Sequence, residues 1–479
     1  MKRSTNESWL VLFFLLLASF LGPLDGSIIN IILPELTKYF HVDLQMVKWL
    51  VLVYLLVITS LLPMAGWLAD RYGLRRLLVL GLGIFAGSSL ALAFSPSIGF
   101  MIFMRAVQGL GATLMFATTA ALITRIFVRQ RGLALGMVGT SVSIALTLGP
   151  PLGGALTDYF SWRAVFLVNV PLGILAIAGI LMKVRAQPRV TVEGADRGVA
   201  VKASLPALNT ASFAIAVGSL VLWLSWLAEP PAPPFAGLER LLPWCFFVFG
   251  ALFALLEMQR KGSLIDYSLF RIRDFTVSAL TGVVQFANTF IALFLLPFVI
   301  IVYLGYQARV AGLLMASIPV ANTVMAPIAG YLSDRIGYRF LTCAGLVVRA
   351  GGFFLLLLVV KGAPVGVLVV VLAVLGIGAG IFGAPNTSSL MGATPKDKLG
   401  TGSAIIAFAR NLGMLIGVSA AALLLAWREG HYQAVLGLGA LSGRALHESQ
   451  AFILAFHDIA IIAGCLALLA AVISSFRSK

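Results

Sequence analysis

The eleven residues GWLADRYGLRR at positions 66–76 return later in the chain as GYLSDRIGYRF at positions 330–340. The two copies lie 264 residues apart, and each places glycine, Asp-Arg, glycine and arginine in the same order. Charged segments are rare here, because only 11% of the 479 residues are charged while 60% are hydrophobic. Two matching charged segments therefore predict an architecture built from two related halves.

The composition indicates a membrane protein. The mean hydropathy is +1.02, and soluble domains carry about 25% charged residues, which this chain does not approach. Its apolar runs, such as 9–33, are long enough to cross a hydrocarbon core of about 30 Å. Because that first run lacks a small-residue cleavage site, we expect a retained helix and not a signal peptide. The net charge of +16 is then assigned to loops at the membrane surface, not to nucleic-acid binding.

We expect an all-α integral membrane fold with fourteen transmembrane helices, divided as six, two and six. The expected spans are 9–33, 47–69, 77–95, 99–123, 133–157, 164–182, 205–227, 241–259, 275–304, 310–332, 341–360, 364–387, 401–426 and 451–475. The corresponding units are residues 1–185, a first six-helix bundle; residues 186–274, two additional helices with their loops; and residues 275–479, a second six-helix bundle.

The distribution of basic residues supports this count. If the N-terminus is cytoplasmic, the inner segments hold 23 of the 34 Lys and Arg residues and the outer segments hold eight. The other three basic residues, Arg105, Arg349 and Arg410, fall within expected spans. Cytoplasmic loops of membrane proteins are enriched in Lys and Arg. Both termini are therefore expected in the cytoplasm.

Both copies of the opening segment then lie on the cytoplasmic side, after the second and tenth helices. Glycine permits positive φ and close approach, and the Asp can pair with an Arg or with a helix N-terminus. We expect these turns to act as gates that hold helices together in one state and release them in another. The alternative is a charged turn that only sets the topology. The residues of the two loops are Gly66, Asp70, Arg71, Gly73, Arg75 and Arg76, and Gly330, Asp334, Arg335, Gly337 and Arg339.

The repeated loop resembles motif A of the major facilitator superfamily, and fourteen spans resemble its drug:proton antiporter branch. LDGSIINIILPEL (24–36), RAVQGLGA (105–112) and LGPPLGG (148–154) resemble the first-helix signature, motif B and the antiporter motif C. WRAVFLVNVPLG (162–173) and FARNLGMLIGVS (408–419) resemble further stretches of the family. The second copy of motif A departs from the pattern at Ser333 and Phe340, which puts the strength of the second gate in doubt.

Two ionisable residues in the outer half of the membrane are candidates for proton coupling. Asp25 and Arg105 lie at similar depth in the first and fourth expected helices. Charged residues within the bilayer are costly and are functional by default. Burial favours the neutral carboxyl and a nearby Arg favours the carboxylate, so movement of Arg105 or of water can load and unload a proton. The alternative is a permanent structural ion pair. The resemblance implies proton coupling, because the matching acid serves it in the family.

Further polar residues within spans are expected to line a substrate cavity or to join helices. They are Asn30, Gln108, Gln285, Asn288 and Arg410. Asn288 aligns with Asp25 at an offset of 263 residues, so the second half has no equivalent carboxylate. Glu257 lies near a span end, where we expect solvation at the interface.

Small residues in the fifth expected helix predict a tight seam with a neighbouring helix. They are Gly149, Pro150, Gly153 and Gly154. Glycine removes side chains between helices and proline permits a bend. The alternative is ordinary small-residue packing.

No enzymatic, metal or cofactor site is expected. The three cysteines and four histidines lack the spacing of metal ligands. GAGIFG (378–383) matches a dinucleotide fingerprint, but it lies inside an apolar span and is expected to serve helix packing.

The resulting hypothesis is a proton-coupled antiporter in the cell membrane, or in the inner membrane of a two-membrane cell. It would export small amphiphilic molecules by alternating access, without nucleic acid or cofactors. The alternatives are a nutrient importer or uniporter of the same fold, and a membrane sensor or assembly protein that transports nothing. Any partner protein across a second membrane stays open.

Overall fold

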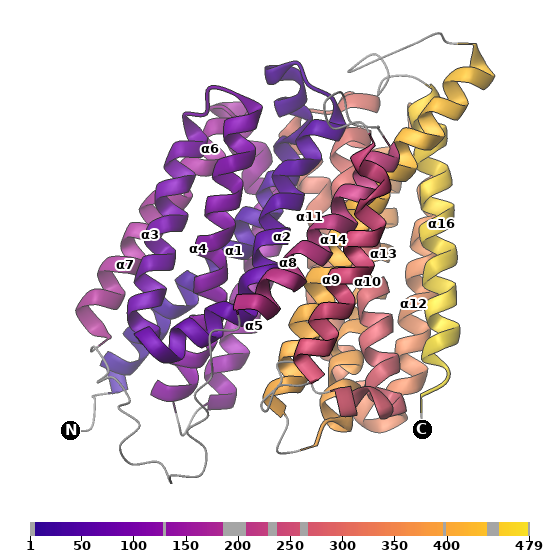
Figure 1. Cartoon of the computed structure of the whole chain (residues 1–479). Coiled ribbons are helices and arrows are strands. Elements are labelled where there is room, and N and C mark those ends of the chain that lie inside the picture. The colour runs from indigo at the N-terminus through magenta and orange to yellow at the C-terminus, as the bar shows by residue number, and fades with distance from the viewer. Residues whose placement is uncertain are drawn as a thin grey trace.

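The protein is a bundle of long helices in a computed structural model, which describes residues 5–127, 131–184, 207–228, 237–258, 267–395, 399–437 and 450–477 (Figure 1). These residues contain no β-strand. The first seven helices are α1 (Thr5–Phe40), α2 (Leu44–Tyr72), α3 (Leu74–Ala93), α4 (Ile98–Ile126), α5 (Arg131–Tyr159), α6 (Trp162–Leu167) and α7 (Asn169–Lys183). They are followed by α8 (Ala207–Ala228) and α9 (Leu242–Met258). The remaining helices are α10 (Arg273–Pro297), α11 (Ala308–Ile336), α12 (Tyr338–Leu355), α13 (Val365–Ala393), α14 (Leu399–Leu436) and α16 (Gln450–Ser474).

Thirteen helical segments among the described residues are long and apolar enough to cross a membrane. They cover every expected span except the fifth, 133–157. That span is nevertheless a continuous helix of 29 residues, α5, which packs against α1 and α11. The fourteen expected spans thus correspond to thirteen apolar helical segments and the helix α5.

Several helix boundaries differ from the expected ones. The sixth expected span, 164–182, is interrupted at Val168, which separates α6 from α7. The span expected at 401–426 is only part of α14, which continues to Leu436. The span expected at 275–304 is α10 followed by a π-helical segment, η3 (Phe298–Tyr303).

The helices gather in two groups with α8 and α9 against them. In Figure 1, α1 to α7 lie on the left and α10 to α16 on the right. Helix α8 contacts α9, and it also contacts α2 of one group and α14 of the other. The start of α1 and the end of α16 lie at the same end of the bundle (Figure 1).

Glycine shapes the turns of both motif copies. Gly73 separates α2 from α3 with φ of 94°, and Gly337 separates α11 from α12 with φ of 86°. A side chain at either position would be strained at these angles, whereas glycine adopts them freely. The duplicated second glycine is thus explained by backbone geometry. We call the end of the bundle that carries these two turns the basic end.

The two groups of helices meet closely at the end opposite the basic end. The carboxylate Oδ2 of Asp158, at the end of α5, accepts a 2.8 Å hydrogen bond from the backbone N–H of Arg309, at the start of α11. The side chain of Arg309 donates to the hydroxyl of Tyr159 at 3.1 Å. On the other side of the bundle, Gln45 of α2 donates to the carbonyl of Ala422 of α14 at 3.0 Å.

Between α5 and α11 the backbones are in direct contact. A Cβ added to Gly154 would lie 2.3 Å from the carbonyl oxygen of Ala308, and one added to Gly312 would lie 2.2 Å from that of Pro150. In the same region, a Cβ at Gly149 would lie 2.5 Å from Cβ of Ser27 in α1. The glycines and Pro150 of motif C therefore lie where α5 approaches both α1 and α11 most closely.

This packing predicts that Gly154→Ala opens the contact between α5 and α11. The added methyl group cannot be accommodated next to backbone atoms, so we expect destabilisation of this packed state by about 1–3 kcal/mol, as for an overpacked core. Spin labels at Phe160 and Val360, in a chain whose three native cysteines are replaced, should report a longer distance between the two groups.

Gly139→Ala is the matched control, because a Cβ at Gly139, in the same helix, would meet nothing within 4 Å. Equal distance distributions for the two variants would contradict the role assigned to Gly154.

Candidate functional site

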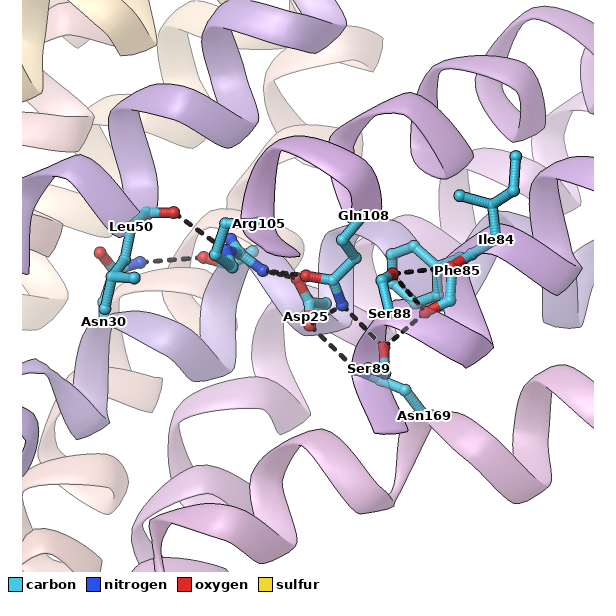
Figure 2. Close-up of polar contacts among 11 residues, drawn as sticks. Asp25, Asn30, Leu50, Ile84, Phe85, Ser88, Ser89, Arg105, Gln108 and Asn169 are labelled. Carbon is cyan, nitrogen blue, oxygen red and sulfur yellow. Dashed lines mark hydrogen bonds and ion pairs between the residues drawn. The ribbon is translucent and has the colours of Figure 1, made fainter. Parts of the chain in front are cut away.

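Asp25 lies in a buried hydrogen-bond network between α1, α3, α4 and α7 (Figure 2). Its side chain is 2% exposed, and its Oδ2 lies 2.5 Å from Nη1 of Arg105, which is 0% exposed. The structure therefore joins these two residues, predicted from different helices, in one buried ion pair. A pair in this setting loses most of its hydration, and its partners stabilise each other strongly when other hydrogen bonds complete them.

Gln108 connects the ion pair to α3. Its Nε2 donates to Oδ1 of Asp25 at 3.0 Å and to Oγ of Ser89 at 2.8 Å, while its Oε1 accepts from Nη1 of Arg105 at 2.5 Å. Ser89 in turn donates to the carbonyl of Phe85 at 2.7 Å. Arg105 and Gln108 are three residues apart, which places them on one face of α4.

Asn169 completes the shell around the carboxylate. Its Nδ2 donates to Oδ1 of Asp25 at 2.9 Å, and its side chain is 1% exposed (Figure 2). It is the first residue of α7, directly after the interruption at Val168. The sequence analysis did not select Asn169. The available signal was an amide side chain inside an apolar run, two residues before Pro171.

Arg105 is held on three sides. Its Nε donates to the carbonyl of Leu50 in α2 at 2.9 Å, and its Cζ lies 4.3 Å from the centre of the Tyr54 ring. Its Nη2 and the hydroxyl of Tyr54 are buried without a hydrogen-bond partner. The sequence analysis did not select Tyr54 either, because a tyrosine within an apolar span is usually a packing residue. Both unpaired atoms are free to form new hydrogen bonds when the helices around the ion pair rearrange.

Four of the five residues expected to line a cavity are buried in this structure. Asn30, Gln108 and Asn288 are 0% exposed and Gln285 is 5% exposed. Asn30 donates to the carbonyl of Gly26 one turn away in α1, at 2.9 Å. Asn288 donates to the carbonyl of Ala463 at 3.1 Å and thereby joins α10 to α16. Only Arg410, in α14, is partly exposed.

Arg349 and Glu257 are two further buried charged residues. Arg349 in α12 is 1% exposed and donates to Oγ1 of Thr289 at 2.8 Å and to the carbonyl of Leu375 at 3.3 Å. Glu257 in α9 accepts from Nδ2 of Asn209 in α8 at 2.8 Å and is 0% exposed. The expectation of interfacial solvation for Glu257 is therefore wrong, because α8 covers it.

The loops at the basic end show mainly exposed arginines. Nη2 of Arg75 donates to the carbonyl of Leu181 in α7 at 2.7 Å. Cζ of Arg71 lies 5.4 Å from the Trp67 ring centre, and that of Arg335 lies 4.6 Å from the Tyr331 ring centre. Arg76 and Arg339 are exposed. The side chains of Asp70 and Asp334 lie outside the described part of the structure, so the gate role assigned to these loops stays a prediction.

Metal binding has no support in the described residues. They contain no cluster of three or more His, Cys, Asp or Glu side chains that could hold a metal ion. The site consists instead of the Asp25 carboxylate, the Arg105 guanidinium and the neutral side chains of Ser89, Gln108 and Asn169.

Comparison with known proteins agrees with the family resemblance of the motifs. The model of the Major Facilitator Superfamily matches residues 15–270 and 278–477. The riboflavin transporter RibZ of Clostridioides difficile is 29% identical over 415 residues, covering 86% of this chain and 87% of RibZ. The multidrug resistance protein Stp of Mycobacterium tuberculosis is 30% identical over 409 residues, covering 84% of this chain and 73% of Stp.

The fold agrees with a solved structure as well. A bacterial homologue of the human lysosomal transporter Spinster, in an inward-facing and unoccupied conformation, superposes with a TM-score of 0.72 at 14% identity, covering 98% of both chains. The similarity to multidrug resistance proteins supports the drug:proton antiporter branch. The chain is thus a multi-pass cell-membrane transporter, not an enzyme, and it belongs to the Major Facilitator Superfamily.

Proposed function

We propose that the protein is a proton-coupled antiporter that exports small amphiphilic molecules by alternating access. Its basic end faces the cytoplasm and its termini lie there. Residues 1–185 and 275–479 are the two six-helix bundles that move against each other, and residues 186–274 contribute two additional helices. The protein works in the lipid bilayer with protons and a small substrate, without a cofactor.

The buried Asp25–Arg105 pair is the observation that carries this proposal. An intramembrane ion pair is costly to maintain, and a transporter gains from it if one partner exchanges a proton. Three side chains donate hydrogen bonds to Asp25: Arg105 and Gln108 from α4, and Asn169 from α7. These bonds hold the carboxylate in the closed conformation. A helix movement that breaks them frees the carboxylate to take up the transported proton.

Alternating access supplies such a movement. With the contacts between α5 and α11 closed at the outer end, Asp25 is 2% exposed and exchanges no proton with the outside. Opening of the outer end moves α1 and α5 away from α11, and Asp25 becomes accessible. Protonation there weakens its bond to Arg105, and return to the inward-open state delivers the proton. The motif A loops at Gly73 and Gly337 act as the cytoplasmic gates.

The motif C glycines act as the seam that seals the closed state. Gly149, Gly153 and Gly154 let α5 lie directly on α1 and α11, and Pro150 contributes its carbonyl to the contact with Gly312. A seam of backbone against backbone leaves little space for water. It therefore limits proton leak past Asp25 while substrate is loaded from the cytoplasm.

The energetics suit export of neutral or anionic molecules. One proton entering through about 100 mV releases about 2.3 kcal/mol, and half a pH unit adds about 0.7 kcal/mol. Together these support a gradient on the order of a hundredfold for a neutral substrate. For a monovalent cation the voltage contributions cancel. For a monovalent anion they add, and the attainable gradient rises to the order of 10⁴.

Nutrient transport is the alternative favoured by one specific finding, the similarity to a riboflavin transporter. Import and export differ in the direction of coupled flux, not in the fold. A sensor or assembly protein of the same fold would show no flux at all. The direction and the proton dependence of transport therefore separate these functions.

The central experiment measures pH-driven transport in everted membrane vesicles. Wild-type vesicles loaded at low internal pH should accumulate a fluorescent amphiphile, and a protonophore should abolish this accumulation. Asp25→Asn keeps the size of the side chain but removes the exchangeable proton, so we expect its accumulation to fall to that of vesicles without the protein.

Equal membrane abundance of both proteins is the control. Accumulation by Asp25→Asn that still collapses with protonophore would move the proton site elsewhere. Wild-type uptake in the opposite direction, or uptake indifferent to the pH gradient, would contradict the proposed antiport.

A second prediction concerns Asn169. Asn169→Ala removes one of the hydrogen bonds to the ionised Asp25, and a hydrogen bond to a charged group contributes about 1.5–3 kcal/mol. The carboxylate then has one hydrogen-bond partner fewer, so we expect Asn169→Ala vesicles to accumulate less of the fluorescent amphiphile than wild-type vesicles at equal membrane abundance.

Asn209→Ala is the matched control, because Asn209 is also a buried asparagine that donates to a carboxylate, Glu257, but in α8. Accumulation by Asn169→Ala equal to that of the wild type would show that the hydrogen bond from Asn169 to Asp25 does not contribute to transport.

A further inference from the structure

We propose that Arg410 is the charged recognition point of the substrate site and that the preferred substrates carry an anionic group, such as a carboxylate, sulfonate or phenolate. This inference rests on the proposed transport function and adds the chemical class of its substrate. It does not depend on which residue carries the proton.

Arg410 differs from the other two arginines within the spans. Arg105 and Arg349 are 0% and 1% exposed, and both donate to side-chain and backbone oxygens. Arg410 is partly exposed, and within the described residues it has no hydrogen bond, ion pair or aromatic ring contact. A guanidinium presents five N–H donors in a fixed fork. Those of Arg410 are therefore available to a ligand.

The position of Arg410 in α14 indicates which space it faces. Phe408 packs against Phe213 of α8, with ring centres 5.6 Å apart. Arg410 is two residues further along, and two residues correspond to about 200° around a helix. Arg410 therefore lies on the face of α14 that points away from α8.

The glycines that follow Arg410 define the same face. Gly413 and Gly417, three and seven residues later, pack on α10, where added Cβ atoms would lie 2.5 Å from the carbonyl of Val283 and 2.3 Å from that of Ala287. Arg410 thus lies on the α10 side of α14, about one turn closer to the basic end. A partly exposed guanidinium facing lipid tails would be very costly. We infer that it faces a water-accessible space beside α10.

Electrostatics favours an anion at this position. Among the described residues, Asp25, Glu257 and Glu429 are at most 5% exposed, and Asp458 pairs with Arg428 at 2.5 Å. Glu35 is partly exposed, but it lies near the end of α1 opposite the basic end, whereas Arg410 lies in the half of α14 nearer the basic end. No described carboxylate is paired with Arg410. A substrate carboxylate or sulfonate can bind the guanidinium through two parallel hydrogen bonds.

The test uses three dyes that share one xanthene skeleton and differ in charge. Fluorescein is anionic, rhodamine 110 is zwitterionic, and its methyl ester rhodamine 123 is cationic. Binding of each dye to the purified full-length protein in neutral detergent is measured by fluorescence polarisation, with protein-free micelles as the blank. We expect the wild type to bind fluorescein most tightly and rhodamine 123 most weakly.

Arg410→Gln should weaken fluorescein binding about 10- to 100-fold, the range for a lost hydrogen bond to a charged group. Rhodamine 123 binding should stay constant or become tighter. Arg410→Lys retains the charge without the fork and should recover part of the affinity for fluorescein, which excludes misfolding as the cause. Arg240→Gln, an exposed arginine near the start of α9, is the matched control and should bind all three dyes as the wild type does.

Wild-type binding that is no tighter for fluorescein than for rhodamine 123 would overturn the inference. So would equal loss of all three dyes in Arg410→Gln. The vesicle assay separates this outcome from failure of the proposed function: an Arg410-dependent preference for fluorescein without pH-driven flux would leave the anion site intact and reject the antiport.

Discussion

The ion pair between Asp25 and Arg105 is the interaction on which the first helix group depends. It brings together α1 and α4, and its hydrogen-bond partners extend the contact to α2, α3 and α7. Removing one partner of such a pair leaves an uncompensated charge in a low-dielectric interior, which is strongly destabilising. The polar side chains around it complete the hydrogen bonding of the Asp25 carboxylate, while Nη2 of Arg105 has no partner.

The two helix groups differ in which charged residues they bury and in how those residues are hydrogen-bonded. At the position of Asp25 the second group has Asn288, a neutral side chain that joins α10 to α16. One of its buried cations, Arg349, lies on α12 and donates to the hydroxyl of Thr289 and to a backbone carbonyl. The duplication is therefore retained in the turns and in the helix order, while the charge chemistry has diverged.

Packing between the groups depends on the absence of side chains. At Gly154 and Gly312 the backbones of α5 and α11 are too close for a Cβ, and Asp158 binds the first turn of α11 at the same end. Because backbone atoms of α5 and α11 touch directly, a small rotation of either helix breaks all of these contacts at once. Such a seam suits a boundary that must be either closed or open.

The sequence by itself determined the membrane class, the duplicated turns and the candidate pair Asp25 and Arg105, because hydrophobic runs, basic loops and rare intramembrane charges are local features of the chain. Only the tertiary structure decided which polar residues meet. It brought Asn169 onto Asp25, enclosed Glu257 beneath α8, and buried Asn30, Gln285 and Asn288 while it left Arg410 partly exposed. Residues 144 positions apart touch through the packing of α1 against α7, and no spacing in the sequence encodes that contact. The chemical character of each residue was readable in advance, but its partner was set by how the helices pack.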